Sequence, residues 1–184
     1  MKKFNIQNEL KQIIENKKLI ELDINGIEDL IYGYFLKANE EYLALAVINS
    51  NGMLVGITMC RMEDVNLIST ESNFINEMAK LVDRDNVYAQ VLKEIENIIE
   101  FTFIGFASYL QDTKTVAAVT RNNQENIEGR IVGFDENFMV VDEYAAGKDK
   151  KVARTYFPFD DITRISIGST LLKATSRYLA ENNL

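Results

Sequence analysis

The amino-acid sequence predicts an α+β fold that consists of two tandem five-stranded small β-barrels with flanking and connecting helices. Three observations lead to this prediction. One stretch of sequence repeats later in the chain, each copy carries five short strand patterns joined mostly by tight turns, and helical patterns lie before, between and after the copies. A repeat at a fixed offset indicates a repeated structural unit, and closely spaced short strands with turn signals are typical of small β-rich units.

The repeat can be followed along the chain. Residues 31–45 recur as residues 127–141, and residues 62–69 recur, after a slip of one position, as residues 159–166. The domain organisation that we predict from this repeat is a first helix–barrel–helix repeat over 1–84, connecting helices over 85–112, and a second barrel with a C-terminal helix over 113–184.

The first copy begins with a helical pattern and continues with strand patterns. Leu10, Ile13 and Ile14 lie at helical spacing, and Asn8 can cap the helix, so we expect a helix over 8–17. Apolar alternation interrupted by turn sequences predicts the strands that follow, and apolar residues on one face predict the helix after them. The expected strands are 19–24, 30–38, 42–48, 53–61 and 65–68, and the expected helix is 73–82.

The second copy follows the same order after a second helical run over 87–99. The apolar segment 101–110 suits a buried strand as well as a buried helix. Because the repeat aligns it with the first helix of the chain, we expect a helix there. The remaining expected elements are strands at 115–120, 127–134, 138–144, 152–158 and 162–167, and a closing helix at 169–181.

Composition and charge indicate a globular protein of a reducing compartment. The 184 residues are 47% hydrophobic and 26% charged, and the net charge of −8 disfavours an electrostatic grip on a nucleic-acid backbone. The single cysteine, Cys60, cannot form an internal disulfide and fits a buried thiol. The amino terminus lacks the apolar run of a signal peptide, and no apolar stretch is long enough to span a bilayer. We therefore expect a cytoplasmic protein without membrane association.

Few residue patterns in the chain support catalysis. The sequence contains no histidine, which excludes imidazole-based triads and most zinc sites. Its nine glycines are scattered, so no phosphate-binding loop is expected. The duplicated acids Asp64 and Asp161 could bind a cation or act as acid and base, although acids at such steps more often bond the turn backbone. We expect no enzyme activity, no cofactor and no metal, and keep a metal-dependent hydrolase using Asp64 and Asp161 as an alternative.

Aromatic side chains are the remaining functional signal. Many of them must pack in the cores, but strand alternation predicts that Tyr34, Tyr144 and Tyr156 lie outside, where tyrosines make good interface anchors. With Asp64 and Asp161, these three tyrosines are the candidate binding residues. Lys148, Lys150 and Lys151 form a basic spot at an expected hairpin tip, which usually serves solubility.

The second copy resembles the first motif of the Sm-like family of small barrels, which share their architecture with SH3-like barrels. The matching pattern is Gly129, then apolar residues, then the aromatic–aspartate pair Phe134 and Asp135, then apolar residues. The resemblance implies a helix followed by five bent strands, and outer strands that pair between copies to give a homo-oligomer. The RNA-binding members place an asparagine where Met139 and Leu43 stand here and later carry an arginine–glycine pair that this chain lacks. The resemblance therefore implies the fold without the RNA site.

A second resemblance, of residues 42–81, is to uncharacterised bacterial proteins and implies no activity. Together these observations favour a non-enzymatic protein-interaction module of a bacterial cytoplasm that presents an acidic surface to another protein. One specific form is an immunity or antitoxin-like protein that binds a basic partner, since opposite charge steers such encounters. RNA binding by the Sm-like surface is an alternative, although nucleic acid is an unlikely partner for an acidic chain.

Overall fold

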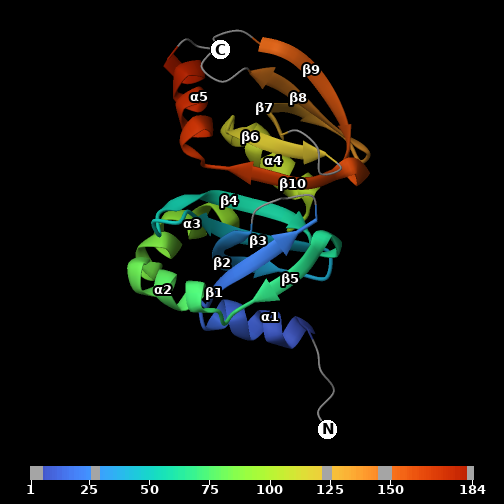
Figure 1. Cartoon of the computed structure of the whole chain (residues 1–184). Coiled ribbons are helices and arrows are strands. Elements are labelled where there is room, and N and C mark those ends of the chain that lie inside the picture. Colours follow the sequence, from blue (N-terminus) through green and yellow to red (C-terminus); the bar gives the residue numbers. More distant parts are fainter. Residues whose placement is uncertain (1–5, 26–29, 122–125, 145–150, 182–184) are drawn as a thin grey trace. The chain divides into compact units, whose positions relative to one another are not determined.

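The structure is a computed structural model that describes residues 6–25, 30–121, 126–144 and 151–181 (Figure 1). The chain divides into two compact units, Met1–Glu96 and Asn97–Leu184. Both of the expected connecting helices are present, one at the end of the first unit and the other at the start of the second. None of the helices in the described part of the chain is long and apolar enough to cross a lipid bilayer.

Unit 1 is an antiparallel sheet with helices on its faces. Its strands follow the spatial order β5-β1-β2-β3-β4. The helices are α1 (Ile6–Glu15), α2 (Asn73–Leu81) and α3 (Arg84–Glu96), and the strands are β1 (Leu19–Ile24), β2 (Ile31–Ala38), β3 (Tyr42–Ile48), β4 (Leu54–Arg61) and β5 (Val65–Ser69), the last preceded by the 3-10 turn η1 (Met62–Asp64).

Unit 2 repeats this arrangement. Its strands follow the order β10-β6-β7-β8-β9, which is the order of unit 1 with each strand replaced by its counterpart. The helices are α4 (Phe103–Thr113) and α5 (Thr170–Glu181), and the strands are β6 (Val116–Arg121), β7 (Asn126–Phe134), β8 (Phe138–Tyr144), β9 (Lys151–Pro158) and β10 (Ile162–Ile167), the last preceded by the 3-10 turn η2 (Phe159–Asp161).

The predicted closed barrels are wrong, because the strands form open antiparallel sheet. Closure would require β4 to pair with β5 in unit 1 and β9 with β10 in unit 2, and neither pairing occurs among the described residues. Strand length and turn chemistry are the same in open and closed sheets, so the sequence pattern could not separate them. In unit 1 the sheet is covered instead by helices, with contacts of α1 to β2 and of α3 to β2, β3 and β4.

The strands and helices themselves were predicted to within a few residues. Strands 19–24, 42–48, 138–144 and 162–167 begin and end as expected. The ambiguous segment 101–110 is a helix, as the repeat indicated, since α4 begins at Phe103. Thr102 caps this helix by accepting a hydrogen bond at Oγ1 from the Gly105 N–H at 3.0 Å.

Two local irregularities occur at equivalent places in the two units. The pairing of β2 with β3 shifts register between Phe35 and Lys37, and that of β7 with β8 shifts between Ile131 and Gly133. Such bulges bend a strand and raise its twist. The hairpin turns that follow are also alike, because the side-chain oxygen Oδ1 of Asn39 or of Asp135 accepts two backbone N–H bonds from the turn.

The core of unit 1 lies on both faces of its sheet. On one face, Leu43, Leu45 and Cys60 pack in a fully buried cluster with Leu10 of α1. Cys60 is therefore a buried thiol, as expected. The opposite face is closed by α3, whose Tyr88 ring lies 5.6 Å from that of Tyr34 on β2. Apolar burial on two faces explains why β3 is buried at six of its seven positions.

Candidate functional site

The three candidate tyrosines have different environments. Tyr34 is only 2% exposed, so its prediction as a surface anchor is wrong: α3 covers the face of the sheet to which Tyr34 belongs. Tyr144 is half-buried and packs against the cluster of Val116 and Leu172. Tyr156 is 62% exposed, so its side chain lies on the surface as expected.

The duplicated acids occupy equivalent positions, at the last residue of η1 and of η2. Asp161 accepts a hydrogen bond at Oδ2 from Arg121 Nε at 2.9 Å. Asp64 has a buried Oδ2 atom with no hydrogen-bond partner, and burial, with the neighbouring Glu63 charge, raises its pKa. Among the described residues no group of three or more acids and cysteines could hold a metal ion.

Tyr156 belongs to an apolar patch on one face of unit 2. The register pairs Val140 with Tyr156, and Phe138 lies two residues before Val140 on the same face of β8. The intervening residue Met139 points to the opposite face and is fully buried. Tyr156 and Phe138, 62% and 43% exposed, thus form part of a hollow of about 490 Å³. Its lining residues are Phe134, Asp135, Phe138, Val140 and Tyr156.

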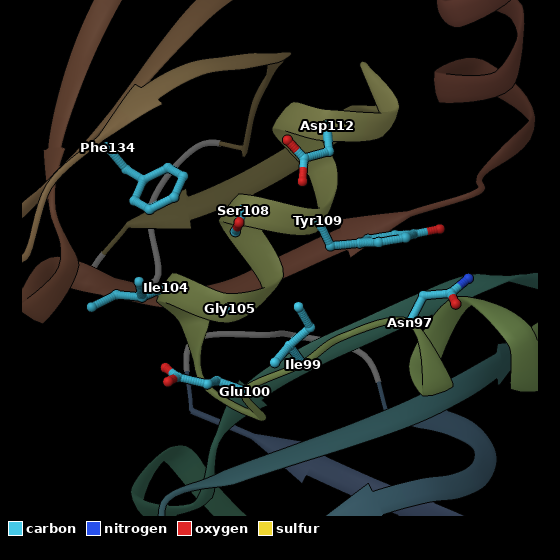
Figure 2. A pocket seen from close by; sticks show the side chains of 9 residues that line it. All are labelled: Asn97, Ile99, Glu100, Ile104, Gly105, Ser108, Tyr109, Asp112 and Phe134. Carbon is cyan, nitrogen blue, oxygen red and sulfur yellow. The ribbon is translucent and has the colours of Figure 1, made fainter.

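A second hollow of about 280 Å³ lies along α4 (Figure 2). Figure 2 shows Glu100 near the start of α4, Asp112 near its end and Phe134 beside the helix. Ile104, Ser108 and Asp112 follow at intervals of four residues and therefore lie on one face of α4. The complete lining consists of Asn97, Ile99, Glu100, Ile104, Gly105, Ser108, Tyr109, Asp112 and Phe134.

The backbone before α4 packs closely against the first turn of that helix, beside the second hollow. The segment before α4 crosses the first turn of the helix so closely that a Cβ atom on Gly105 would overlap the carbonyl oxygen of Glu100. Ile99, next to Glu100 in that segment, is 97% exposed. A large apolar side chain is thereby presented beside an exposed carboxylate, a combination suited to a partner that carries both apolar and cationic groups.

Phe134 contributes to the linings of both hollows, and its register partner Met139 places its side chain on the face of the sheet opposite to Phe138 and Tyr156. We call the residues of the two linings together the aromatic–acidic surface. Its aromatic side chains include Phe134, Phe138 and Tyr156. Its rim carries the exposed carboxylates Glu100, Asp112 and Asp135.

The charge of this surface is negative. None of the described residues that line the two hollows is a lysine or an arginine. Hydrogen bonds from the backbone N–H groups of Asn137 and Phe138 lower the pKa of Asp135, so this carboxylate is ionised at neutral pH. A cationic side chain placed over Phe134 or Tyr156 would also meet the negative face of an aromatic ring.

Two cations on the same face of the sheet bind Asp142. Asp142 lies opposite Arg154 in the register and accepts hydrogen bonds from its guanidinium. Asp142 also forms an ion pair with Lys151, whose Nζ atom lies 2.7 Å from Oδ1. Of the predicted basic spot, Lys148 and Lys150 lie outside the described residues, and Lys151 is bound to this carboxylate. Arg154 and Lys151 line neither hollow.

Sequence reasoning did not single out the pocket along α4. The helix expected over 87–99 ends at Glu96, which leaves Ile99 and Glu100 in the segment before α4. The sequence offered one signal of this pocket, which is the apolar residue Ile99 next to the acid Glu100, shortly before the helix-capping residue Thr102.

In comparisons with known proteins, no family model, no curated protein and no solved structure matches this chain. The aromatic–acidic surface is therefore the feature from which a function can be inferred.

Proposed function

We propose that the protein is a non-enzymatic interaction module of a bacterial cytoplasm that binds a basic partner protein through the aromatic–acidic surface. The observation that carries the proposal is that exposed aromatic rings and exposed carboxylates line two hollows of unit 2 that share Phe134. Exposed aromatic side chains in a concave patch are typical binding hot spots, and a surrounding rim of like charge selects a partner of opposite charge.

The net charge of the whole chain supports the same partner class. A net charge of −8 attracts a basic protein over distances comparable to the Debye length and raises the rate of encounter. An immunity or antitoxin-like protein, which must capture a basic toxin rapidly, is the specific form of the proposal. The absence of histidine from the sequence removes the commonest general base and supports a binding role over a catalytic one.

Site-specific photo-crosslinking in the native host tests the proposal. A photoreactive phenylalanine analogue replaces Phe138, and a matched control places it at Leu67, which is 49% exposed on β5 in unit 1. We expect a discrete protein adduct from position 138 and none from position 67. The adduct should contain a basic protein and should decline about tenfold in the Glu100→Lys, Asp112→Lys double variant, since each reversal places a cation against the partner.

Three outcomes would contradict the proposal. The first is an acidic protein in the adduct, and the second is an adduct whose yield rises on charge reversal. The third is an adduct that nuclease digestion removes, which would favour the RNA-binding alternative. Raising the ionic strength should lower the adduct yield of the parent protein, because salt screens attraction between exposed charges.

A further inference from the structure

The two units differ in what covers one face of the sheet. In unit 1, α3 contacts β2, β3 and β4. Four side chains of α3 are buried, namely Val87, Tyr88, Val91 and Ile95. Tyr88 also donates a hydrogen bond from its hydroxyl to the Phe35 carbonyl of β2 at 3.0 Å. This face of unit 1 is thus closed by an amphipathic helix that belongs to the same unit.

The register identifies the same face in unit 2. Ala44 pairs with Met59 in unit 1, and the equivalent pair in unit 2 is Val140 with Tyr156. Ala44 and Met59 are fully buried, whereas Val140 is half-buried and Tyr156 is 62% exposed. In unit 2, α4 packs on β7 and α5 on β6. The face of β8 and β9 that carries Phe138, Val140 and Tyr156 is therefore the counterpart of the face that α3 covers in unit 1.

We infer that the partner binds this face of β7, β8 and β9 with an amphipathic helix, placed as α3 is placed on β2, β3 and β4. The inference rests on the proposed function and specifies the shape of the partner. β8 is paired on both sides, so its backbone donors and acceptors are already used. An extended segment gains its affinity from backbone bonds at a sheet edge, whereas a helix binds a sheet face through its side chains.

Side-chain volumes indicate what such a helix carries. In unit 1 the sheet contributes Ala44 and Met59 at the equivalent pair, and the helix contributes large apolar residues. In unit 2 the sheet contributes Val140 and Tyr156 at this face, so close packing requires smaller apolar residues on the partner helix. Lysine or arginine residues flanking its apolar stripe would lie opposite Asp135.

Titration of the isotopically labelled full-length protein with synthetic peptides tests the inference. The helical probe is an end-capped peptide that keeps the 13-residue length and apolar spacing of α3, with alanine in place of tyrosine and lysine in place of the acidic residues. The control peptide has the same composition, rearranged so that apolar and lysine residues alternate with the period of a strand. Amide chemical shifts report the site of binding, and transferred nuclear Overhauser effects report the bound peptide's conformation.

We expect the helical probe to perturb Phe138, Val140 and Tyr156 and to bind as a helix, at least about tenfold more tightly than the alternating peptide. Tyr156→Ser should weaken its binding about tenfold, and Leu67→Ser, a matched change of an exposed residue in unit 1, should leave it unchanged.

Several results would overturn the inference and leave the proposed function standing, because the crosslinking experiment tests that function separately. One is tighter binding of the alternating peptide at the same residues. Another is a helical probe that fails to bind, or that binds equally well to the Tyr156→Ser variant. Perturbation confined to other residues would likewise overturn it.

Discussion

Asp142 on β8 is held by both arms of the Arg154 guanidinium on β9. Arg154 Nε donates to Oδ1 at 2.5 Å and Nη2 donates to Oδ2 at 2.8 Å, a bidentate geometry that the cross-strand register sets up. The Asp142 side chain is 11% exposed, and Lys151 lies 2.7 Å from Oδ1. These hydrogen bonds, those from Arg154 above all, lower the pKa of Asp142 to about 2.

This pair predicts a pH-dependent contribution to stability. Because the pKa in the folded state is below the usual value of 3.8, the contribution is complete above pH 4 and is lost as the pH falls towards 2. The cations are partly exposed, so solvent screening limits the expected contribution to about 1 kcal/mol. Asp142→Asn should lower the free energy of unfolding by that amount at pH 7 and by little at pH 2. Urea denaturation followed by circular dichroism measures both, and an equal loss at the two pH values would contradict the pairing.

Two equivalent glycines allow neighbouring strands to approach. A Cβ atom on Gly33 would overlap the Ala46 carbonyl oxygen, and one on Gly129 would overlap that of Asp142, each well inside the 3.0 Å that real Cβ atoms keep. We expect Gly33→Ala and Gly129→Ala each to lower the free energy of unfolding by about 3 kcal/mol, because the backbone of β3 or β8 would have to shift.

Gly133 provides the matched control for this prediction. It lies on β7 with Gly129, but a Cβ atom there would meet no atom within 4 Å. Gly133→Ala should therefore change stability by less than about 0.5 kcal/mol. Thermal denaturation of the three variants checks the order, and a destabilisation by Gly133→Ala as large as that by Gly129→Ala would contradict the steric explanation.

Local structure was predictable from the sequence because its signals are local. Alternation over six or seven residues fixes a strand, and Asn39 and Asp135 mark their turns by chemistry that acts within four residues. Closure of a barrel would require β4 to pair with β5, or β9 with β10, and alternation within a strand does not specify which strand pairs with it. The prediction therefore succeeded for the elements and failed for their closure.

The candidate site was predictable to a smaller extent for the same reason. Tyr34 and Tyr156 both lie on strands with alternating patterns, and only the presence of α3 over one of them separates a core residue from a surface residue. Alternation assigns a side chain to a face, but it does not report whether a helix covers that face. Glu100 and Asp112 join Phe134 through tertiary packing that no local pattern encodes.

We expect the same substitution to have a large effect on stability at Tyr34 and little effect at Tyr156. Tyr34→Ala removes a ring that is 2% exposed and packed on Tyr88, so it should cost about 3 kcal/mol of stability. Tyr156→Ala removes a mostly exposed ring and should change stability by less than about 0.5 kcal/mol. Urea denaturation measures both, and similar losses would show that Tyr156 has a structural role and is unsuitable as a probe of binding.

We expect the protein to become more stable when Asp64 is replaced by asparagine. The pKa of Asp64 is raised by burial first and by the Glu63 charge second, against a smaller lowering by Arg61, and its Oδ2 atom has no hydrogen-bond partner. A carboxyl with a raised pKa holds its proton more strongly in the folded state, so its effect on stability is most favourable at low pH and becomes unfavourable as the pH rises past 3.8.

Asp64→Asn removes the charge with little change of shape and should raise the melting temperature at pH 7 by roughly 2 °C, a small value because the side chain is only partly buried. At pH 3, where both states of the parent protein are largely protonated, the two melting temperatures should converge. A lower melting temperature for Asp64→Asn at pH 7 would mean that the carboxylate is stabilised by a bound cation or partner, and would revive the acid pair as a functional site.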